Sequence, residues 1–246
     1  MLERPRKLIS LSYFSKRYES AKSSISEDLS ILKRTFQERG TGLLETVPGA
    51  AGGARFIPYM TESEAAEFID DICRLVNDET RVLPGGYVYL SDLLGRPDIL
   101  RQAGRLIATQ YIRDDIDAVM TAATKGVPLA QAVADQLNVP FVIVRDDAKV
   151  TEGPTVSVNY LTGSSKRVEK MELSRRSLRT GSRVLVVDDF MKAGGTIQGM
   201  QTLVGEFDGT VVGTAVFAEG RSTTLSLIHI SEPTRRLMAS RMPSSA

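Results

Sequence analysis

The sequence predicts an α/β protein whose main domain, a doubly wound parallel sheet, follows a small amino-terminal domain. From residue 117 onward, apolar runs typical of buried strands alternate with helical patterns, at residues 117–121, 139–144, 184–187 and 211–217. The first 60 residues instead show two helical patterns and then two short apolar runs around a glycine-rich tip. We therefore expect an amino-terminal domain over 1–60, a linker or docking helix over 61–82 and the α/β domain over 83–224.

Composition places the chain among globular proteins that lack a disulfide framework. Of its 246 residues, 42% are hydrophobic and 25% are charged, as in ordinary soluble domains. No apolar run is long enough to span a membrane and no signal-peptide core is present, so we expect a cytoplasmic location and no membrane partner. One cysteine and one histidine exclude a disulfide framework and argue against a zinc site. Cys73 lies in an apolar helical pattern and is interpreted as a structural thiol.

The amino-terminal domain is predicted to be a winged helix. A short helix over 11–18, with Ser12 as its N-cap, precedes a turn and a second helix over 21–40 that ends at Gly40. Two short apolar runs within 43–59 form a hairpin around a tip of small residues. Helix, turn, helix and wing is the order of winged-helix DNA-binding domains. A helical hairpin that merely packs on the main domain fits the same pattern and is the alternative.

Positive charge and small hydroxyls gather where such a domain would meet DNA. Residues 1–60 hold more Lys and Arg than Asp and Glu, whereas the rest of the chain is slightly acidic. The predicted contacts to DNA are Lys16, Arg17, Lys22, Ser23, Ser24, Ser26 and Arg55. Few residues precede Leu11 and Pro5 interrupts them, so the first helix of a complete winged helix is expected to be missing. Ile25 and Leu29 are then expected to be partly open to water.

The stretch VLVVDDFMKAGGT over 184–196 predicts a site for a phosphorylated sugar. A buried strand ends in Asp188 and Asp189, which can accept hydrogen bonds from vicinal ribose hydroxyls. The following loop, and the helix that begins near Thr196, offer backbone N–H groups to a phosphate. An ordinary strand-loop-helix turn with solvated carboxylates is the alternative. The stretch resembles the phosphoribosyl pyrophosphate (PRPP) motif of type I phosphoribosyltransferases.

Two further segments fit this resemblance. Residues 123–128 (ATKGVP) follow a strand and precede a helix, so their N–H groups and Lys125 can hold a pyrophosphate, as the corresponding loop does in the transferase family. The long polar segment 149–171, which contains Tyr160, matches the mobile lid over that family's active site.

Residues 7–220 are similar to the purine operon repressors of Gram-positive bacteria. The likeness rests on KRYESAKSSISEDL, VPGAAGG, LPGGYVYL, ATKGVPLA, KVTEG, NYLTGSS and DDFMKAGGT. It implies a homodimeric transcription factor that represses purine synthesis and salvage genes and leaves operator DNA when PRPP binds, with or without Mg²⁺. Guanosine tetraphosphate or purine nucleotides are further ligands that it implies for the same pocket. The implied effector residues are Asp188, Asp189, Lys192, Ala193, Gly194, Gly195, Thr196, Thr124, Lys125, Tyr87 and Tyr160.

No catalytic residue and no required cofactor are expected. Lys192 and Ala193 stand where enzymes of the transferase family often carry small or hydroxyl residues, and Ala193 cannot donate a hydrogen bond from its side chain to phosphate. Binding without stabilisation of a transition state gives a sensor rather than a catalyst. A catalytically active purine phosphoribosyltransferase is the alternative, and the basic helix pair argues against it.

The carboxyl-terminal residues 225–246 do not resemble the family. LSLIHISEPTR is similar to the translation of a transposase sequencing adaptor, and SRMPSSA to that of a flow-cell adaptor. We interpret residues 225–246 as adaptor read-through, expect them to be disordered or packed arbitrarily, and give His229 no function. On this interpretation the remaining carboxyl-terminal strands and helix of the family are absent from the main domain.

Overall fold

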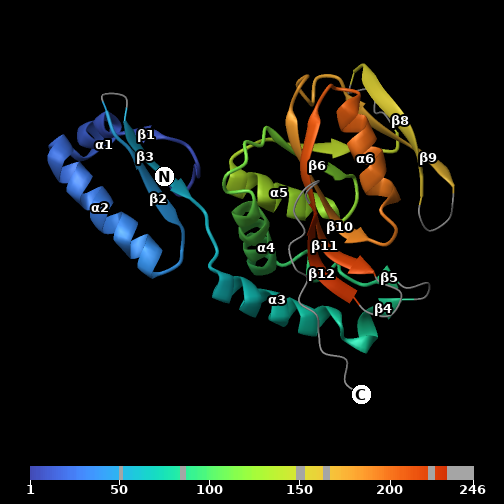
Figure 1. The fold of residues 1–246 in the computed structure, drawn as a ribbon. Helices are drawn as coiled ribbons and strands as arrows, with labels where there is room; N and C mark the ends of the chain where they lie inside the picture. The colour runs from blue at the N-terminus through green and yellow to red at the C-terminus, as the bar shows by residue number, and fades with distance from the viewer. Residues whose placement is uncertain (50–51, 84–86, 148–152, 163–166, 221–224, 232–246) are drawn as a thin grey trace.

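The computed structural model describes residues 1–49, 52–83, 87–147, 153–162, 167–220 and 225–231 of the chain. A small amino-terminal domain lies at one end and a larger α/β domain at the other (Figure 1). The long helix α3 (Glu62–Val76) follows the connection between them and runs along the α/β domain. Its N-cap, Thr61, accepts a hydrogen bond from the Glu64 N–H at 3.3 Å while the Glu64 carboxylate accepts one from the Thr61 N–H at 3.0 Å, a complete capping box.

The amino-terminal domain consists of two helices on a three-stranded antiparallel sheet. Helices α1 (Leu11–Tyr18) and α2 (Lys22–Glu38) follow the short strand β1 (Ile9–Ser10), and the wing strands β2 (Leu43–Val47) and β3 (Gly53–Ile57) complete the sheet in the order β1-β3-β2. No helix precedes Leu11 within residues 1–10, all of which the structure describes. The predicted order of helix, turn, helix and wing is confirmed.

The ends of the two helices show one wrong and one correct prediction. Ser10, not Ser12, caps α1, because Ser10 has extended backbone and its hydroxyl accepts a hydrogen bond from the Tyr13 N–H at 3.2 Å. Gly40 ends α2 as expected. Its φ of +64° lets Gly40 and the next residue turn their N–H groups back to carbonyls of the last helical turn, a Schellman motif.

The core of the amino-terminal domain is closed, contrary to expectation. Ile25 and Leu29 are only 6% and 4% exposed, so the prediction that they would be partly open to water is wrong. They pack with Phe14, Leu44 and Phe56 of the helices and the wing. The sheet, which includes β1, and the partly buried side chains of the first 11 residues cover this face, so the two helices form a core without a preceding helix.

The α/β domain is built on a five-stranded sheet of order β12-β11-β10-β6-β7. Its four neighbouring parallel strands are β11 (Thr210–Gly220), β10 (Arg183–Met191), β6 (Ala118–Ala122) and β7 (Phe141–Val144). At the other edge β12 (Leu225–Ser231) pairs antiparallel with β11. Parallel strands joined through helices confirm the predicted doubly wound sheet.

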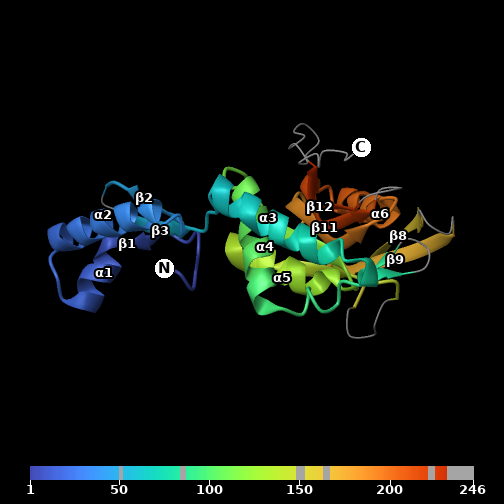
Figure 2. The ribbon, with the colours of Figure 1, turned by 90° about the horizontal axis from the view of Figure 1, so that it is seen from below.

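Helices cover both faces of this sheet, which explains the continuous apolar runs of its strands. Helices α4 (Pro97–Gln110) and α5 (Gly126–Leu137) pack with α3 on one face, whereas α6 (Gly195–Gly205) and the hairpin of β8 (Thr155–Leu161) and β9 (Val168–Ser174) cover the other (Figures 1 and 2). In β10, Leu185 and Val187 belong to the first cluster and Val184 and Val186 to the second. Each residue of the run is therefore buried.

A second, very short hairpin stands beside the carboxyl ends of the strands. It consists of β4 (Val82–Leu83) and β5 (Tyr87–Val88), after the single turn η1 (Glu79–Arg81), and its tip, 84–86, lies outside the described residues. The Arg81 guanidinium anchors it by donating two hydrogen bonds of 2.7 Å to the Asp92 carboxylate. This bidentate pair fixes the hairpin to the chain that leads into α4.

Two expectations about loops and the tail need correction. Residues 149–171 are not one long loop, because 155–161 and 168–174 pair as the β8–β9 hairpin, while 148–152 and 163–166 lie outside the described residues. The expectation that 225–246 would be disordered or packed arbitrarily is wrong for 225–231, which form β12. The edge of β11 offers unpaired backbone groups, and an apolar, β-branched segment suits them. Residues 232–246 lie outside the described residues, so the adaptor origin stays a prediction. None of the helices in the described ranges is long and apolar enough to cross a membrane.

Candidate effector site and nucleic-acid interface

An acidic pair lies at the carboxyl end of β10, the strand at the centre of the sheet. Asp188 is only 4% exposed, and its Oδ1 accepts a hydrogen bond from the Asp189 N–H at 3.0 Å. Burial raises the pKa of the Asp188 carboxyl from 3.8 to about 8, and the neighbouring Asp189 carboxylate adds to the shift. Without a ligand to balance its charge, the acidic pair therefore tends to bind one proton and to carry one negative charge instead of two.

Thr124 brings the second predicted loop to this acidic pair. Its hydroxyl can donate a hydrogen bond to Asp188 Oδ1 at 3.4 Å or to Asp189 Oδ1 at 3.3 Å. The same oxygen accepts a hydrogen bond from the Gly126 N–H at 3.3 Å. The two loops were predicted separately from the sequence, 64 residues apart, and they meet because β6 and β10 are neighbours in the sheet. Lys125 lies next to Thr124 at the N-cap of α5, and its side chain is exposed.

Gly126 contributes to the site by having no side chain, which the sequence analysis missed. A Cβ atom at this position would lie 2.8 Å from Asp188 Oδ1, 2.8 Å from Thr121 Oγ1 and 3.1 Å from the Asp189 nitrogen. Glycine thus allows α5 to begin directly against the acidic pair. The strand-loop-helix context of the ATKGVP segment is the sequence signal that could have identified it.

The predicted phosphate loop joins β10 to α6. Lys192 and Ala193 are exposed, and Gly194 takes the N-cap position with φ of +76°, a left-handed conformation that favours glycine. No side chain caps this helix, so the first-turn N–H groups from Gly195 and Thr196 onward face the loop without a side-chain acceptor. A phosphate group fits such a helix start.

Two aromatic side chains contact the phosphate loop and the start of α6. The Lys192 ammonium lies 4.5 Å from the centroid of the Tyr87 ring, so β5 reaches over the loop through a cation–π contact. Tyr160 on β8 donates a 2.9 Å hydrogen bond to Glu169 and also bonds to Thr196. Burial, with the Glu169 contact, raises the pKa of the Tyr160 phenol to about 12, and the Thr196 contact opposes that shift.

Tyr160 lies against α6 because Gly199 leaves room for it. A Cβ atom at Gly199 would lie 2.7 Å from Met171 Cε and 2.9 Å from Tyr160 Cγ, so the hairpin packs directly on the helix backbone. The structure thus gathers all the predicted effector residues around the carboxyl ends of β6 and β10.

The predicted DNA contacts fall into one group and one outlier. The side chains at the end of α1 and the start of α2 are exposed on one turn of the amino-terminal domain: Lys16, Arg17, Lys22, Ser23, Ser24 and Ser26. Arg55 lies apart on β3 and forms an ion pair of 2.6 Å with Glu45 on β2. A DNA phosphate would have to compete with Glu45 for Arg55.

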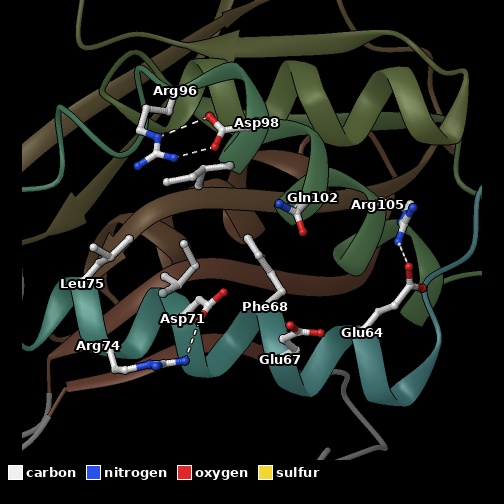
Figure 3. A pocket seen from close by; sticks show the side chains of 12 residues that line it. Glu64, Glu67, Phe68, Asp71, Arg74, Leu75, Arg96, Asp98, Gln102 and Arg105 are labelled. Atoms are coloured by element: carbon white, nitrogen blue, oxygen red, sulfur yellow. Dashed lines mark hydrogen bonds and ion pairs between the residues drawn. The ribbon is translucent and has the colours of Figure 1, made fainter.

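A cavity of about 590 Å³ lies between α3 and α4, away from the acidic pair (Figure 3). Its arginines are held by neighbouring carboxylates, with Arg105–Glu64 at 2.9 Å, Arg96–Asp98 at 2.6 Å and Arg74–Asp71 at 2.5 Å. Because these cations already have partners, we do not assign the effector to this cavity.

Two protein families match successive parts of the chain. The family described as "Bacterial purine repressor, N-terminal" matches residues 1–58, and the "Phosphoribosyl transferase domain" matches residues 91–230. The chain is 55% identical over 228 residues to the purine biosynthesis transcriptional repressor PurR of Bacillus subtilis, covering 93% of this chain and 80% of that protein. The chain belongs to the family of purine biosynthesis transcriptional regulators. It is also 56% identical over 220 residues to the purine biosynthesis transcriptional activator PurR of Lactococcus lactis, covering 89% of this chain and 81% of that protein.

The α/β domain has the fold of a transferase, although relatives of the whole chain are named as regulators. The α/β domain resembles the crystal structure of adenine phosphoribosyltransferase from Rhodothermus marinus, with a TM-score of 0.54 and 26% identity over 63% of this chain and 87% of that chain. The Bacillus and Lactococcus relatives, and a Streptococcus pneumoniae relative that is 57% identical over 220 residues, are named as transcriptional regulators. The predictions of family, fold class and a non-enzymatic DNA-binding regulator are confirmed. The transferase match extends to residue 230 and so includes most of β12.

Proposed function

We propose that this regulator represses purine synthesis and salvage genes and releases its operator when PRPP occupies the pocket at Asp188 and Asp189. The observation that carries the proposal is the meeting of the acidic pair, the Thr124 loop and the uncapped start of α6 at one edge of the sheet. Carboxylates suit the two ribose hydroxyls, and the helix start suits the 5′-phosphate.

The remaining parts of PRPP find suitable neighbours in the same pocket. The pyrophosphate would lie against the loop of Thr124 and Lys125, whose backbone leads into α5. Lys192 would turn from the Tyr87 ring to the 5′-phosphate, exchanging a cation–π contact for a charge-assisted hydrogen bond. Tyr160 would support this phosphate site through Thr196.

Other ligands and the assembly state belong to the same proposal. Mg²⁺ would be bound through the pyrophosphate of PRPP, because Mg²⁺ is commonly held by substrate phosphates. Purine nucleotides or guanosine tetraphosphate would compete for the same phosphate loop, with the base near Tyr87. We expect a homodimer in the cytoplasm, with one winged helix on each half of a symmetric operator.

A mobility-shift assay on purine-gene promoter DNA tests the proposal. The chain is titrated onto labelled promoter with and without PRPP and Mg²⁺, and unrelated DNA at the same salt concentration measures non-specific binding. If PRPP releases the regulator from its operator, operator affinity is lower with PRPP than without it. The Lactococcus relative is named an activator, so the opposite effect is also tested. A higher operator affinity with PRPP would refute release.

The transferase alternative has its own control. The chain is incubated with PRPP, Mg²⁺ and a purine base, and nucleotide formation is measured by chromatography beside an adenine phosphoribosyltransferase. We expect no turnover comparable to that of the enzyme. Nucleotide formation at an enzyme-like rate would overturn the proposed sensor function in favour of a catalytic one.

A further inference from the structure

An arginine from the amino-terminal segment ties the DNA-binding domain to the effector domain. The Arg6 guanidinium donates through Nη2 to the carbonyls of Ala108 and Tyr111, at 3.1 and 3.3 Å. Both carbonyls belong to the last turn and C-cap of α4, where a cation is favoured by the helix dipole. On the other side, the Arg6 N–H donates to the Phe56 carbonyl of β3 at 2.6 Å. One residue thus spans the two domains.

This contact is held at a cost, which suits a junction that changes state. Arg6 has φ of +61°, a left-handed backbone that is unfavourable for a residue with a long side chain. Its Nε is buried and has no hydrogen-bond partner among the described residues. Burial, and the like charge of Arg55, lower the pKa of the guanidinium, while the Asp114 and Glu45 carboxylates oppose that shift. A half-buried cation with one unpartnered nitrogen leaves the docked arrangement only weakly favoured.

The end of α5 faces the amino-terminal domain next to Pro5, the residue before Arg6. A cavity of about 480 Å³ separates Pro5, Phe56 and Pro58 of the amino-terminal domain from the last turn of α5 and the residues after it, 134–139. The junction is therefore loosely packed, with room for the two domains to shift.

The other end of α5 begins at the acidic pair. Gly126, its first residue, lies so close to Asp188 that a Cβ atom would be 2.8 Å from the carboxylate oxygen. Over its 12 residues, a length of roughly 18 Å at 1.5 Å per residue, the helix extends from the pocket to the junction. Helix α4 packs closely on α5, since a Cβ atom on Gly104 would lie 2.7 Å from the Ala132 carbonyl oxygen. The pair α4–α5 therefore connects the pocket with the junction through direct backbone packing.

We propose that Arg6 is the coupling residue between the two domains: it docks the winged helix on the ends of α4 and α5 in the orientation that operator DNA requires. Effector in the pocket displaces the start of α5, the far ends of α4 and α5 shift, and Arg6 loses its two carbonyls. The inference rests on the proposed function and adds the route by which the pocket reaches the DNA-binding surface.

The test compares Arg6→Asn with a matched control, Arg4→Ala. Asparagine tolerates the left-handed backbone but is too short to reach α4. Arg4 lies in the same segment, is exposed, and carries the same charge. Operator affinity is measured by fluorescence anisotropy with and without PRPP and Mg²⁺, and PRPP binding is measured separately by calorimetry. Small-angle scattering of the DNA-free proteins reports whether the two domains separate.

In the parent and in Arg4→Ala, PRPP is expected to weaken operator binding by the same factor. In Arg6→Asn, PRPP should still bind in calorimetry, but its effect on operator affinity should shrink by about tenfold or more, the equivalent of one hydrogen bond to a charged group. If Arg6→Asn does not bind the operator at all, the scattering profiles test the proposal instead. The proposal is supported if PRPP expands the parent and the variant is already expanded without PRPP. It is opposed if the parent and the variant give identical profiles without PRPP.

Two results separate the possible failures. An unchanged PRPP effect in Arg6→Asn overturns the coupling role and leaves the proposed function intact. A parent that binds no PRPP in calorimetry overturns the proposed function itself.

Discussion

Replacing Gly126 by alanine is expected to disturb the effector pocket from within the fold. The added methyl carbon would lie 2.8 Å from two side-chain oxygens, on Asp188 and Thr121, and 3.1 Å from the Asp189 nitrogen. Real Cβ atoms essentially never approach other atoms this closely, so either α5 or the acidic pair must shift. Two of the three neighbours are themselves tied into the pocket, so the strain has little room to relax.

The magnitude follows from the cost of overpacking a closed site. Extra methyl groups in well-packed interiors destabilise by about 1–3 kcal/mol. For a chain of this size, that corresponds to an unfolding temperature lower by about 2–12 °C. PRPP affinity should fall by about tenfold or more, because a displaced Asp188 loses a hydrogen bond to ribose.

Thermal unfolding and calorimetry with PRPP measure the two effects, and Gly205→Ala is the matched control. No atom lies within 4 Å of a Cβ at Gly205, at the end of α6. The same substitution there should raise stability by about 0.4–1 kcal/mol through the unfolded state and leave PRPP affinity unchanged. Equal stability and equal PRPP affinity of Gly126→Ala and the parent would refute the packing argument at the start of α5.

Three further outcomes are expected. Asp189→Ala should bind operator like the parent in mobility shifts but need about tenfold more PRPP for release, since one ribose hydroxyl loses a charged acceptor; release at the parental concentration would exclude this carboxylate as sensor. Because the pKa of Asp188 is raised from 3.8 to about 8, the folded protein keeps a proton that the unfolded chain loses between these values. Stability should therefore fall as pH rises through this window while PRPP affinity increases, and Asp188→Asn should remove the pH dependence from thermal unfolding. Lys22→Ala should lower the slope of log operator affinity against log salt by about 0.9, and an unchanged slope would remove Lys22 from the interface.

The sequence predicted the elements of the pocket because their signals are local. The apolar run before Asp188 and Asp189 and the glycines after them lie within one strand-loop-helix unit, so spacing alone places them at the carboxyl end of a buried strand. The contact of Thr124 with both carboxylates follows once β6 and β10 are neighbours, which a parallel sheet makes probable but does not specify. The family resemblance added Tyr87, which no local pattern connects to Lys192.

The missed features depend on partners far away in the chain. The closure of the core around Ile25 and Leu29 rests on the sheet formed by β1 and the wing, and a two-residue strand leaves no periodic pattern to recognise. Arg6 looked like one basic residue among many, because its carbonyl partners on α4 lie more than 100 positions away. The sequence predicted Ser12 as the N-cap of α1, whereas Ser10 caps the helix. Serine suits the N-cap at either position, and the extended backbone of Ser10 decides between them.

Gly199 sets how closely the β8–β9 hairpin packs beside the pocket, and in the proposed function this packing sets how long an effector stays bound. The β8–β9 hairpin rests on α6 only because this glycine leaves space for Tyr160 and Met171. A larger residue there would push Tyr160 and the hairpin away from the helix while Asp188, Asp189 and the Thr124 loop stay in place, so the effector would dissociate faster. The response time of a purine operon to a falling supply of effector could thus be adjusted at one buried position, independently of which molecule is sensed.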